Sequence, residues 1–219
     1  MFIVSSTLEQ LPDLYEAGTL GIIEHDGWVE AFFEDRETAA QFGDPVEAAE
    51  VDWVQRTEDA WPPVLVGEKF FLVAPWRQEP TPEGRFRLEI NPGQQCGTGQ
   101  HPCTQKCLEA MERIVKPGDK VLDVGSGSGI LSIAAKLLGA GLVVACDIDP
   151  EAAVDFVGSV DAVRDKSFDV VVANINEEVV GKMLEDFRRV APYRILSGFK
   201  NDEDEWACIV EAYSPERDA

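Results

Sequence analysis

The sequence has few of the features that mark membrane or nucleic-acid-binding proteins. It contains no run of about 18 apolar residues, the length that a membrane-spanning helix requires. The N-terminus, Met1 to Thr7, has neither a basic stretch nor a long apolar core, so we expect no signal peptide. Basic residues are scarce, with 19 lysines and arginines against 41 acidic residues and a net charge of −22. Such a charge repels phosphates, so we expect no direct binding to nucleic acid; it either attracts a basic partner or simply maintains solubility.

Cysteine and histidine are also rare, with five and two residues. No two cysteines form a C-x-x-C pair, and Cys103 and Cys107, four residues apart, are followed by no second pair. We therefore expect no metal site. Scattered, reduced cysteines in odd number are typical of a cytoplasmic protein.

Residues 1–60 have the pattern of a small α+β domain. Strand-like runs occupy residues 2–6, 20–24 and 28–34, and helical spacing occupies residues 8–15 and 36–42. The pair Asp26-Gly27 is a strong hairpin signal between the second and third strands. This β-α-β-β-α order resembles part or all of a ferredoxin-like domain.

Residues 61–92 are predicted to be a connector. Six of the 13 prolines fall there, and proline-rich connectors are stiff. We expect a single strand within it, at residues 69–74.

Residues 93–219 have the alternating pattern of an α/β fold. Near-continuous apolar runs such as Asp169-Val-Val-Val-Ala are typical of a parallel sheet covered on both faces. The expected helices are 104–115, 130–138 and 177–190, and the expected strands are 121–124, 141–147, 168–174, 194–197 and 206–213. The fold class is therefore α/β, with a Rossmann-like sheet and a smaller N-terminal domain.

The most informative stretch is Val121-Leu-Asp-Val-Gly-Ser-Gly-Ser-Gly129, where a short strand leads into three glycines. Glycine lets the backbone turn sharply and lets a ligand approach main-chain atoms. A dinucleotide-binding loop has the spacing G-x-G-x-x-G. Here the third glycine comes one residue early, and an acid precedes the loop. This form resembles the first motif of class I S-adenosylmethionine-dependent methyltransferases. The predicted cofactor-binding residues of the loop are Asp123, Gly125, Gly127 and Gly129.

Polar side chains end the neighbouring strands. Asp147 follows Gly129 by 18 residues, which places its carboxylate beside the loop, where it can accept both hydroxyls of a ribose. Asn174 ends a later strand and can accept a hydrogen bond from a substrate amine, or else it only caps the next helix. Thr104, in the first turn of a helix after a glycine-rich loop, is either a ligand contact or a structural cap.

Together these motifs resemble the bacterial PrmA family, which methylates ribosomal protein eleven of the large subunit. The resemblance covers roughly residues 1 to 200, including Asp52-Trp53 and Leu72-Val-Ala-Pro-Trp76. It departs from the family's F-G-T-G-x-H-x-T-T pattern at Cys96 and Cys103. The motifs that carry it are Asn91-Pro-Gly-Gln-Gln-Cys-Gly-Thr-Gly-Gln-His-Pro-Cys-Thr104, Asp123 to Gly129, Asp147-Ile-Asp-Pro150 and Val171-Val-Ala-Asn-Ile175.

The resemblance implies an S-adenosylmethionine-dependent protein N-methyltransferase. It implies cofactor contacts at Thr104, Gly125, Asp147 and Asn174, with Asn174 also orienting the amine. It also implies that residues 1–60 recognise a basic ribosomal protein. We expect a monomer in which His101 is structural and Asp161 is a tentative contact on the adenine side.

Two segments are shorter than the fold requires, near residues 150–156 and 198–205. The first leaves no room for a full crossover helix, and the second leaves none for a helix and a strand. Either the chain carries two deletions, or residues are missing at these points; we favour missing residues. If the deletions are real, the adenine side of the site is poorly walled.

Three functions remain open from the sequence. The first is the ribosomal-protein methyltransferase, the second a class I methyltransferase of a small amine, and the third a degenerate, non-catalytic binding module. An NAD-dependent oxidoreductase is disfavoured by the glycine spacing.

Overall fold

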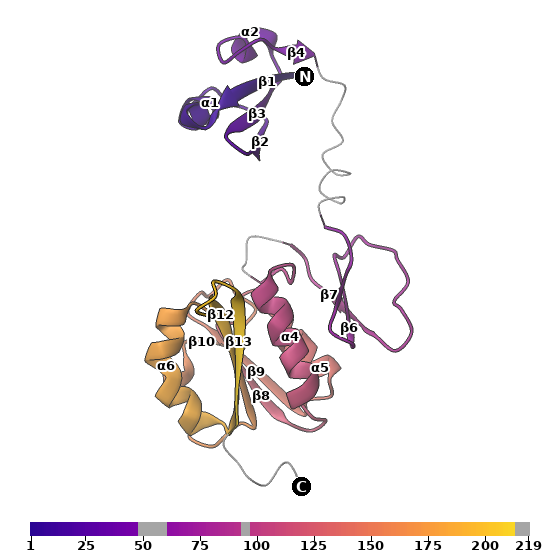
Figure 1. Cartoon of the computed structure of the whole chain (residues 1–219), viewed down its shortest axis with the longest axis vertical. Helices are drawn as coiled ribbons and strands as arrows, with labels where there is room; N and C mark the ends of the chain where they lie inside the picture. The colour runs from indigo at the N-terminus through magenta and orange to yellow at the C-terminus, as the bar shows by residue number, and fades with distance from the viewer. Residues whose placement is uncertain (48–60, 93–96, 213–219) are drawn as a thin grey trace. The chain divides into compact units, whose positions relative to one another are not determined.

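The computed structural model covers residues 1–219 and describes residues 1–47, 61–92 and 97–212. The chain divides into two compact units, Met1–Thr57 and Glu58–Ala219 (Figure 1). The predicted boundary at residue 60, the Asp52-Trp53 pair and Cys96 lie outside the described residues. Each unit is described by itself below.

The first unit is a four-stranded antiparallel sheet with two short helices. The strands lie in the order β2-β3-β1-β4, with β1 between β3 and β4. A β-α-β-β-α-β chain with this order is the split β-α-β arrangement of ferredoxin-like folds, as predicted. The elements are β1 (Phe2–Thr7), η1 (Leu8–Gln10), α1 (Leu11–Glu16), β2 (Gly21–His25), β3 (Trp28–Phe33), α2 (Arg36–Ala39) and β4 (Val46–Glu47).

The core of this unit lies between the sheet and its helices. Leu14 of α1 and Ala39 of α2 are fully buried against apolar side chains of β1 and β3. Helix α2 begins at Asp35, whose carboxylate accepts hydrogen bonds from the backbone N–H groups of Glu37 and Thr38, at 3.1 and 2.7 Å. These bonds satisfy amide groups that a helix start leaves without partners.

The structure corrects the prediction for residues 61–92. This segment carries three strands rather than one: β5 (Val64–Val66), β6 (Phe70–Val73) and β7 (Phe86–Glu89). They form a sheet in the order β5-β6-β7, and the buried residues Phe70, Leu72 and Leu88 belong to the core of the second unit. The prolines of this segment stand outside the strands, so they interrupt no ladder of hydrogen bonds.

The larger sheet of the second unit has six strands in the order β10-β9-β8-β11-β12-β13, parallel except for β13. This arrangement confirms the Rossmann-like α/β fold. The elements are α4 (Pro102–Ile114), β8 (Lys120–Val124), α5 (Ile130–Leu137), β9 (Leu142–Asp147), β10 (Phe156–Val157), η2 (Val160–Ala162), β11 (Val170–Asn174), α6 (Glu177–Val190), β12 (Tyr193–Lys200) and β13 (Trp206–Ala212).

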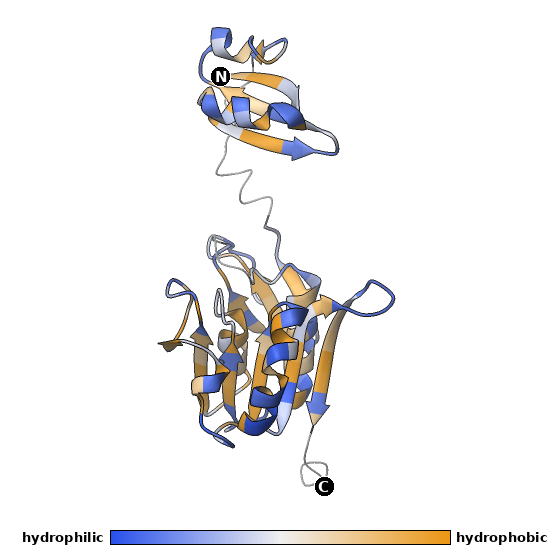
Figure 2. Ribbon diagram, turned by 90° about the vertical axis from the view of Figure 1, so that its left-hand side faces the viewer, coloured by the Kyte–Doolittle hydropathy of each residue, from blue (hydrophilic) through white to orange (hydrophobic). Residues whose placement is uncertain are grey.

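Both faces of this sheet are covered, which explains its continuous apolar strands. On β11, Val170 and Val172 pack in the cluster that contains α4 and α5, whereas Val171 and Ala173 pack in the cluster that contains α6. Successive side chains of a strand point to opposite faces, so both sets are buried. Helix α6 lies on one side of the sheet and α4 and α5 on the other (Figure 1). Colouring by hydropathy shows the strands as mainly apolar (Figure 2).

The two short segments form turns. Residues 148–155 join β9 to β10 through turns without a helix, and residues 201–205 form a hairpin turn between β12 and β13. The expectation that residues are missing at these two points stays a prediction. Tight backbone bonds close both connections, with Asp155 N–H donating to Ala145 O at 2.9 Å and Asn201 N–H donating to Glu205 O at 2.8 Å.

Within the described residues, no helix is both long and apolar enough to span a bilayer.

Candidate functional site

The candidate site lies at the edge of the sheet where β8, β9 and β11 end. Strand order changes direction between β8 and β11, because the chain goes from β8 outward to β9 and β10 and returns to β11 on the other side. Ligands of open α/β sheets bind at such a switch point, outside the carboxyl ends of the strands.

The three glycines of the loop have backbone conformations that other residues rarely adopt. Gly125, Gly127 and Gly129 have φ angles of 72°, 52° and 79°, in the left-handed region. The first turn is fixed against β9, because Gly125 N–H donates to Cys146 O at 2.8 Å. The loop therefore presents backbone atoms at the switch point and leads directly into α5.

Asp147 lies beside this loop. One carboxylate oxygen accepts a hydrogen bond from Gly127 N–H at 3.0 Å, and the other accepts from Asp149 N–H at 3.1 Å. The side chain is half-buried at the end of β9. The geometry thus brings the carboxylate and the loop together, as the sequence predicts.

Asp123 lies beneath the loop rather than on it. Its side chain is fully buried, and one oxygen accepts bonds from the hydroxyls of Ser126 at 3.1 Å and Ser132 at 2.7 Å. The other oxygen has no hydrogen-bond partner among the described residues. Burial raises the pKa of Asp123 to about 6, although the bonds from the two serines act against this shift. Asp123 therefore supports the loop from below, and a direct cofactor contact remains a prediction.

Asn174 and Thr104 meet although they are 70 residues apart. The Asn174 side-chain NH2 donates to the Thr104 hydroxyl oxygen at 3.0 Å. Thr104 is buried on α4, and Asn174 is half-buried at the end of β11. The bond fixes the amide so that its carbonyl oxygen, which has no hydrogen bond to the described residues, remains an available acceptor.

From the sequence, Asn174 and Thr104 could each have served only to cap a helix. In the structure, other residues fill these capping positions. Asn176, not Asn174, begins α6 and accepts a bond from Val179 N–H at 3.0 Å. His101, not Thr104, begins α4, and its ring nitrogen Nδ1 accepts from Cys103 N–H at 3.3 Å. The His101 ring also packs edge-on against Trp206, with ring centroids 4.4 Å apart, in agreement with a structural role.

The loop that precedes α4 packs on the glycine loop. The Ser128 hydroxyl donates to Gly97 O at 2.6 Å, so residues 97–99 lie over the start of α5. A Cβ on Gly99 would collide with Leu72 and Ile130. The φ angles of Gly97 and Gly99, 94° and 87°, favour glycine at both positions.

The sequence reasoning missed Ile148. This residue follows Asp147 directly, and 79% of its surface is exposed. An apolar residue between two acids, Asp147 and Asp149, was the available signal. A large apolar side chain at the mouth of a candidate site is suited to be covered by a ligand.

The loop is also contacted by side chains. A Cβ on Gly125 would collide with the Ile175 side chain, and one on Gly129 would lie 3.0 Å from Ala153 Cβ. Ala153 N–H also donates to Gly127 O at 2.9 Å. A ligand lying across the loop therefore requires Ile175 and residues 150–155 to shift.

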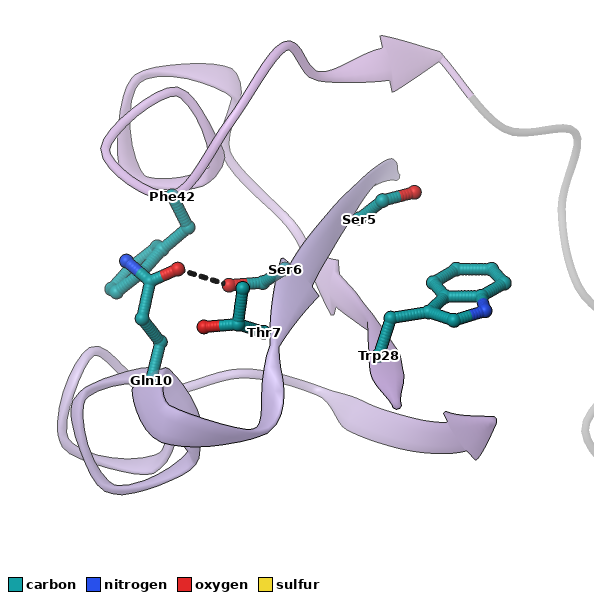
Figure 3. A pocket seen from close by; sticks show the side chains of 6 residues that line it. All are labelled: Ser5, Ser6, Thr7, Gln10, Trp28 and Phe42. Atoms are coloured by element: carbon teal, nitrogen blue, oxygen red, sulfur yellow. Dashed lines mark hydrogen bonds between the residues drawn. The ribbon is translucent and has the colours of Figure 1, made fainter. Parts of the chain in front are cut away.

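Two hollows lined by described residues lie elsewhere. The larger, of about 540 Å³, is in the first unit and is lined by Ser5, Ser6, Thr7, Gln10, Trp28 and Phe42 (Figure 3). The smaller, of about 10 Å³, lies near Trp61 and Leu72. No group of three or more metal-ligating side chains occurs in the described part of the chain.

Comparison with known proteins agrees with this arrangement. Residues 28–214 match the family described as "Ribosomal protein L11 methyltransferase (PrmA)". The chain belongs to the PrmA family.

Individual relatives show the same family. The chain is 44% identical over 141 residues to the ribosomal protein L11 methyltransferase of Burkholderia cenocepacia (strain HI2424), covering 59% of this chain and 47% of that protein. The corresponding protein of Burkholderia vietnamiensis is 43% identical over the same length. The chain spans about half the length of the curated relatives it matches.

A solved structure is also similar. The crystal structure of the ribosomal protein L11 methylase from Lactobacillus delbrueckii subsp. bulgaricus has a TM-score of 0.53 and 29% sequence identity. The match covers 63% of this chain and 80% of that one. It supports the Rossmann-like fold of a PrmA family member.

Proposed function

We propose that this chain is an S-adenosylmethionine-dependent protein N-methyltransferase that methylates lysine or α-amino groups of a basic ribosomal protein. One observation carries the proposal: Asp147 and Asn174, at the ends of β9 and β11, flank a loop of three left-handed glycines at the switch point of the sheet. This is the arrangement that a nucleoside with an amino-acid tail requires, with an acceptor for the sugar on one side and backbone groups in the middle.

The residues present fit S-adenosylmethionine. Asp147 offers a carboxylate to the ribose hydroxyls, the loop from Gly125 to Gly129 offers backbone groups once the Ile175 side chain moves aside, and the Thr104 hydroxyl can donate to the carboxylate of the amino-acid tail. Ile148, which is exposed, would be covered by the base. When bound, the cofactor supplies a methyl group on a positively charged sulfur. An amine nitrogen can attack this methyl in line, without a covalent enzyme intermediate.

The protein's task is to present a neutral amine. A lysine with a pKa of about 10.4 must lose its proton at pH 7, a cost of roughly 4.6 kcal/mol, whereas an α-amine with a pKa of about 7.7 costs only about 1 kcal/mol. The Asn174 carbonyl oxygen can accept one N–H of the amine and so orient the lone pair toward the methyl group. Because Thr104 holds the Asn174 NH2, the carbonyl oxygen stays turned to the ligand side.

The charge of the first unit supports a basic protein partner. Residues 1–47 contain eleven acidic residues and one basic residue, Arg36. We propose that this unit recognises the substrate protein, and that the hydroxyl-lined hollow beside Trp28 lies on the contact surface (Figure 3). Attraction between opposite charges speeds association and weakens as salt rises. We further propose that the chain acts as a monomer in the cytoplasm.

Transfer of tritium from labelled S-adenosylmethionine to isolated ribosomal protein L11 tests the function. The wild-type chain is expected to label the protein, and the variant Asn174→Ala is expected to bind the cofactor but label at least about tenfold more slowly. The variant Asn176→Ala, which alters a helix start two residues away, is the matched control. Absence of labelling by the wild-type chain, with cofactor binding intact, would contradict the proposal.

A non-catalytic binding module is the second candidate. The contact of Ile175 with Gly125 favours it, because this side chain lies where a ligand would cross the loop. Calorimetry with S-adenosylmethionine separates the two functions. Binding accompanied by turnover supports the enzyme, whereas no detectable binding supports the module.

A further inference from the structure

The segment that follows β10 forms a wall beside Asp147. Val157 pairs with Asp147 in register, and Gly158 N–H donates to Asp147 O at 2.8 Å. The chain therefore leaves β10 next to the proposed ribose acceptor and continues into η2. We refer to residues 160–165, which contain η2, as the wall segment.

The wall segment packs beside the end of β9. Burial is the main cause that raises the pKa of the Cys146 thiol to about 12, and the carboxylates of Asp123, Asp147 and Asp161 raise it further. Cys146 precedes Asp147 on β9 and packs in the same buried cluster as Val160 of the wall segment. The wall segment thus borders the side of the site where a base attached to the ribose would lie.

One arginine holds the wall segment. The Arg189 guanidinium, in the last turn of α6, donates to the carbonyl oxygens of Val160 and Asp161, both at 3.1 Å, and of Val163 at 2.5 Å. It also pairs with the carboxylates of Asp165 at 2.8 Å and Asp186 at 2.7 Å. Each guanidinium N–H group of Arg189 that faces the wall segment therefore has a hydrogen-bond acceptor there.

The short connection explains why such a clamp is required. Residues 148–155 contain no helix, β10 has two residues, and in the described sheet no strand pairs with the outer edge of β10. The wall segment therefore lacks a ladder of strand hydrogen bonds, and its backbone carbonyls need other partners. A planar guanidinium with several fixed donors can satisfy three carbonyls at once, which an ammonium group cannot do in the same geometry.

We propose that Arg189 is a positioning residue for the cofactor site, because it fixes the backbone of the wall segment that receives the nucleoside base. The proposal rests on the proposed function. A side chain of α6 thus supports the wall segment, which the helix-free connection between β9 and β10 leaves without a neighbouring helix.

Steady-state kinetics of methyl transfer test this role. In Arg189→Lys the positive charge beside Asp165 and Asp186 is kept, but the fork that binds three carbonyls is lost. We expect the KM for S-adenosylmethionine to rise about tenfold, because such a change corresponds to the loss of roughly one well-made hydrogen bond to a charged group. The kcat and the KM for the protein substrate should change less than about twofold. A purely structural role would instead reduce the active fraction and so lower kcat at unchanged KM.

The neighbouring arginine provides the control. Within the part of the chain that the structure describes, Arg188 pairs with the side chains of Glu185 at 2.8 Å and Glu211 at 3.6 Å and with none of the wall carbonyls. Arg188→Met should therefore keep the KM for S-adenosylmethionine of the wild-type chain. Equal KM values for Arg189→Lys and Arg188→Met would overturn the proposal.

If the Arg189 variants fail to fold, hydrogen exchange of the wild-type chain tests the proposal instead. Addition of S-adenosylhomocysteine should protect the backbone amides of residues 158–166 as well as those of residues 125–129. Protection of the glycine loop alone would overturn the inference and leave the proposed function intact. Absence of any protection, together with absence of binding by calorimetry, would overturn both.

Discussion

The carboxylate of Asp147 accepts a hydrogen bond from the backbone N–H of Gly127 at 3.0 Å. This bond joins the end of β9 to the middle of the glycine loop, which follows β8. A carboxylate in this place serves two purposes: it holds the loop in its left-handed turns, and it offers its remaining lone pairs to a sugar. The same two atoms thus connect the local fold with the proposed cofactor site.

The first prediction concerns the charge of Asp147. Asp147→Asn keeps the size of the side chain but replaces a charged acceptor by a neutral amide. We expect the dissociation constant for S-adenosylmethionine to rise about tenfold or more, because hydrogen bonds to charged groups contribute roughly 1.5–3 kcal/mol. Isothermal calorimetry measures this change.

The matched control is Asp149→Asn. Asp149 lies two residues farther on, is exposed, and accepts a bond from Glu151 N–H at 2.9 Å. It should bind the cofactor like the wild-type chain. Equal affinities for the two variants would show that Asp147 does not hold the ligand.

The second prediction concerns the pH dependence of stability through Asp123. Its folded-state pKa, about 6, lies above its ordinary value of 3.8 because the side chain is buried. Protonation therefore favours the folded state: the stabilising effect is complete below about pH 3.8 and is lost as the pH rises through about 6. Above that pH the buried charge costs on the order of 3 kcal/mol.

Asp123→Asn removes this titration. Relative to the wild-type chain, the variant should gain stability as the pH rises from 5 to 8, by about 1.4 kcal/mol, because the rest of the effect falls between pH 3.8 and 5. Urea unfolding of both proteins across this range measures the difference, and other acidic groups cancel because both proteins share them. Parallel stability curves would mean that Asp123 keeps an ordinary pKa.

The third prediction concerns the partner of Asn174. Thr104→Val preserves the shape of the side chain but removes the hydroxyl that accepts the amide N–H at 3.0 Å. The NH2 group of Asn174 then has lost its partner in a buried site, so we expect a loss of about 1–3 kcal/mol in the free energy of unfolding. Methyl transfer should slow as well, because the amide is no longer held.

Thr104→Ser distinguishes the hydroxyl from the methyl group. It retains the acceptor, and its methyl transfer rate should stay closer to that of the wild-type chain than the rate of Thr104→Val does. If both variants slow the reaction equally, packing rather than the hydrogen bond positions Asn174. Tritium transfer and thermal unfolding measure the two effects separately.

The sequence predicts the parts of the site that depend on local patterns. The loop from Gly125 to Gly129 and the acid at the end of the next strand are encoded by spacing within one strand–helix–strand unit. The bond between Thr104 and Asn174 joins elements 70 residues apart and depends on how α4 packs on the sheet, so spacing alone could suggest that the two residues are near but not that they are bonded.

The difference between local patterns and tertiary packing also explains why the prediction of a connector with one strand at residues 61–92 was wrong. Proline content suggested a connector, yet β6 and β7 pair in parallel across an intervening stretch, and their apolar side chains fill the core beside α4 and α5. Each strand has only three or four residues, too few for a periodic signal. Tertiary packing, rather than local propensity, makes these strands.

The fourth prediction concerns Ile148, which is 79% exposed beside Asp147. If the base of the cofactor covers this side chain, burial contributes on the order of 1–2 kcal/mol to binding. Ile148→Ser should therefore weaken S-adenosylmethionine binding about fivefold to thirtyfold without loss of stability. Calorimetry and thermal unfolding check both parts.

Ile209→Ser is the control for Ile148. Ile209 is also exposed, by 47%, but it lies on β13 at the far edge of the sheet. Its replacement should leave binding unchanged. Wild-type affinity in Ile148→Ser would mean that the base lies elsewhere.

The last prediction concerns the backbone behind Asn174. Gly198 has a φ angle of 105°, and a Cβ at this position would collide with the backbone carbonyl of Ile175. The close approach is part of the pairing of β11 with β12, because Ile175 N–H donates to Ser197 O at 3.0 Å. Gly198→Ala should thus destabilise the chain by about 1–3 kcal/mol or more, and it should slow methyl transfer by displacing Asn174.

Gly181→Ala is the matched control, since Gly181 lies within α6 and a Cβ there meets no atom within 4 Å. It should stabilise the chain by about 0.5–1 kcal/mol, because alanine loses less conformational freedom in a helix than glycine does. Urea unfolding should therefore shift in opposite directions for the two glycine variants. A shift in the same direction would mean that β12 does not approach Ile175 closely, and the position of Asn174 would then have to be fixed by Thr104 alone.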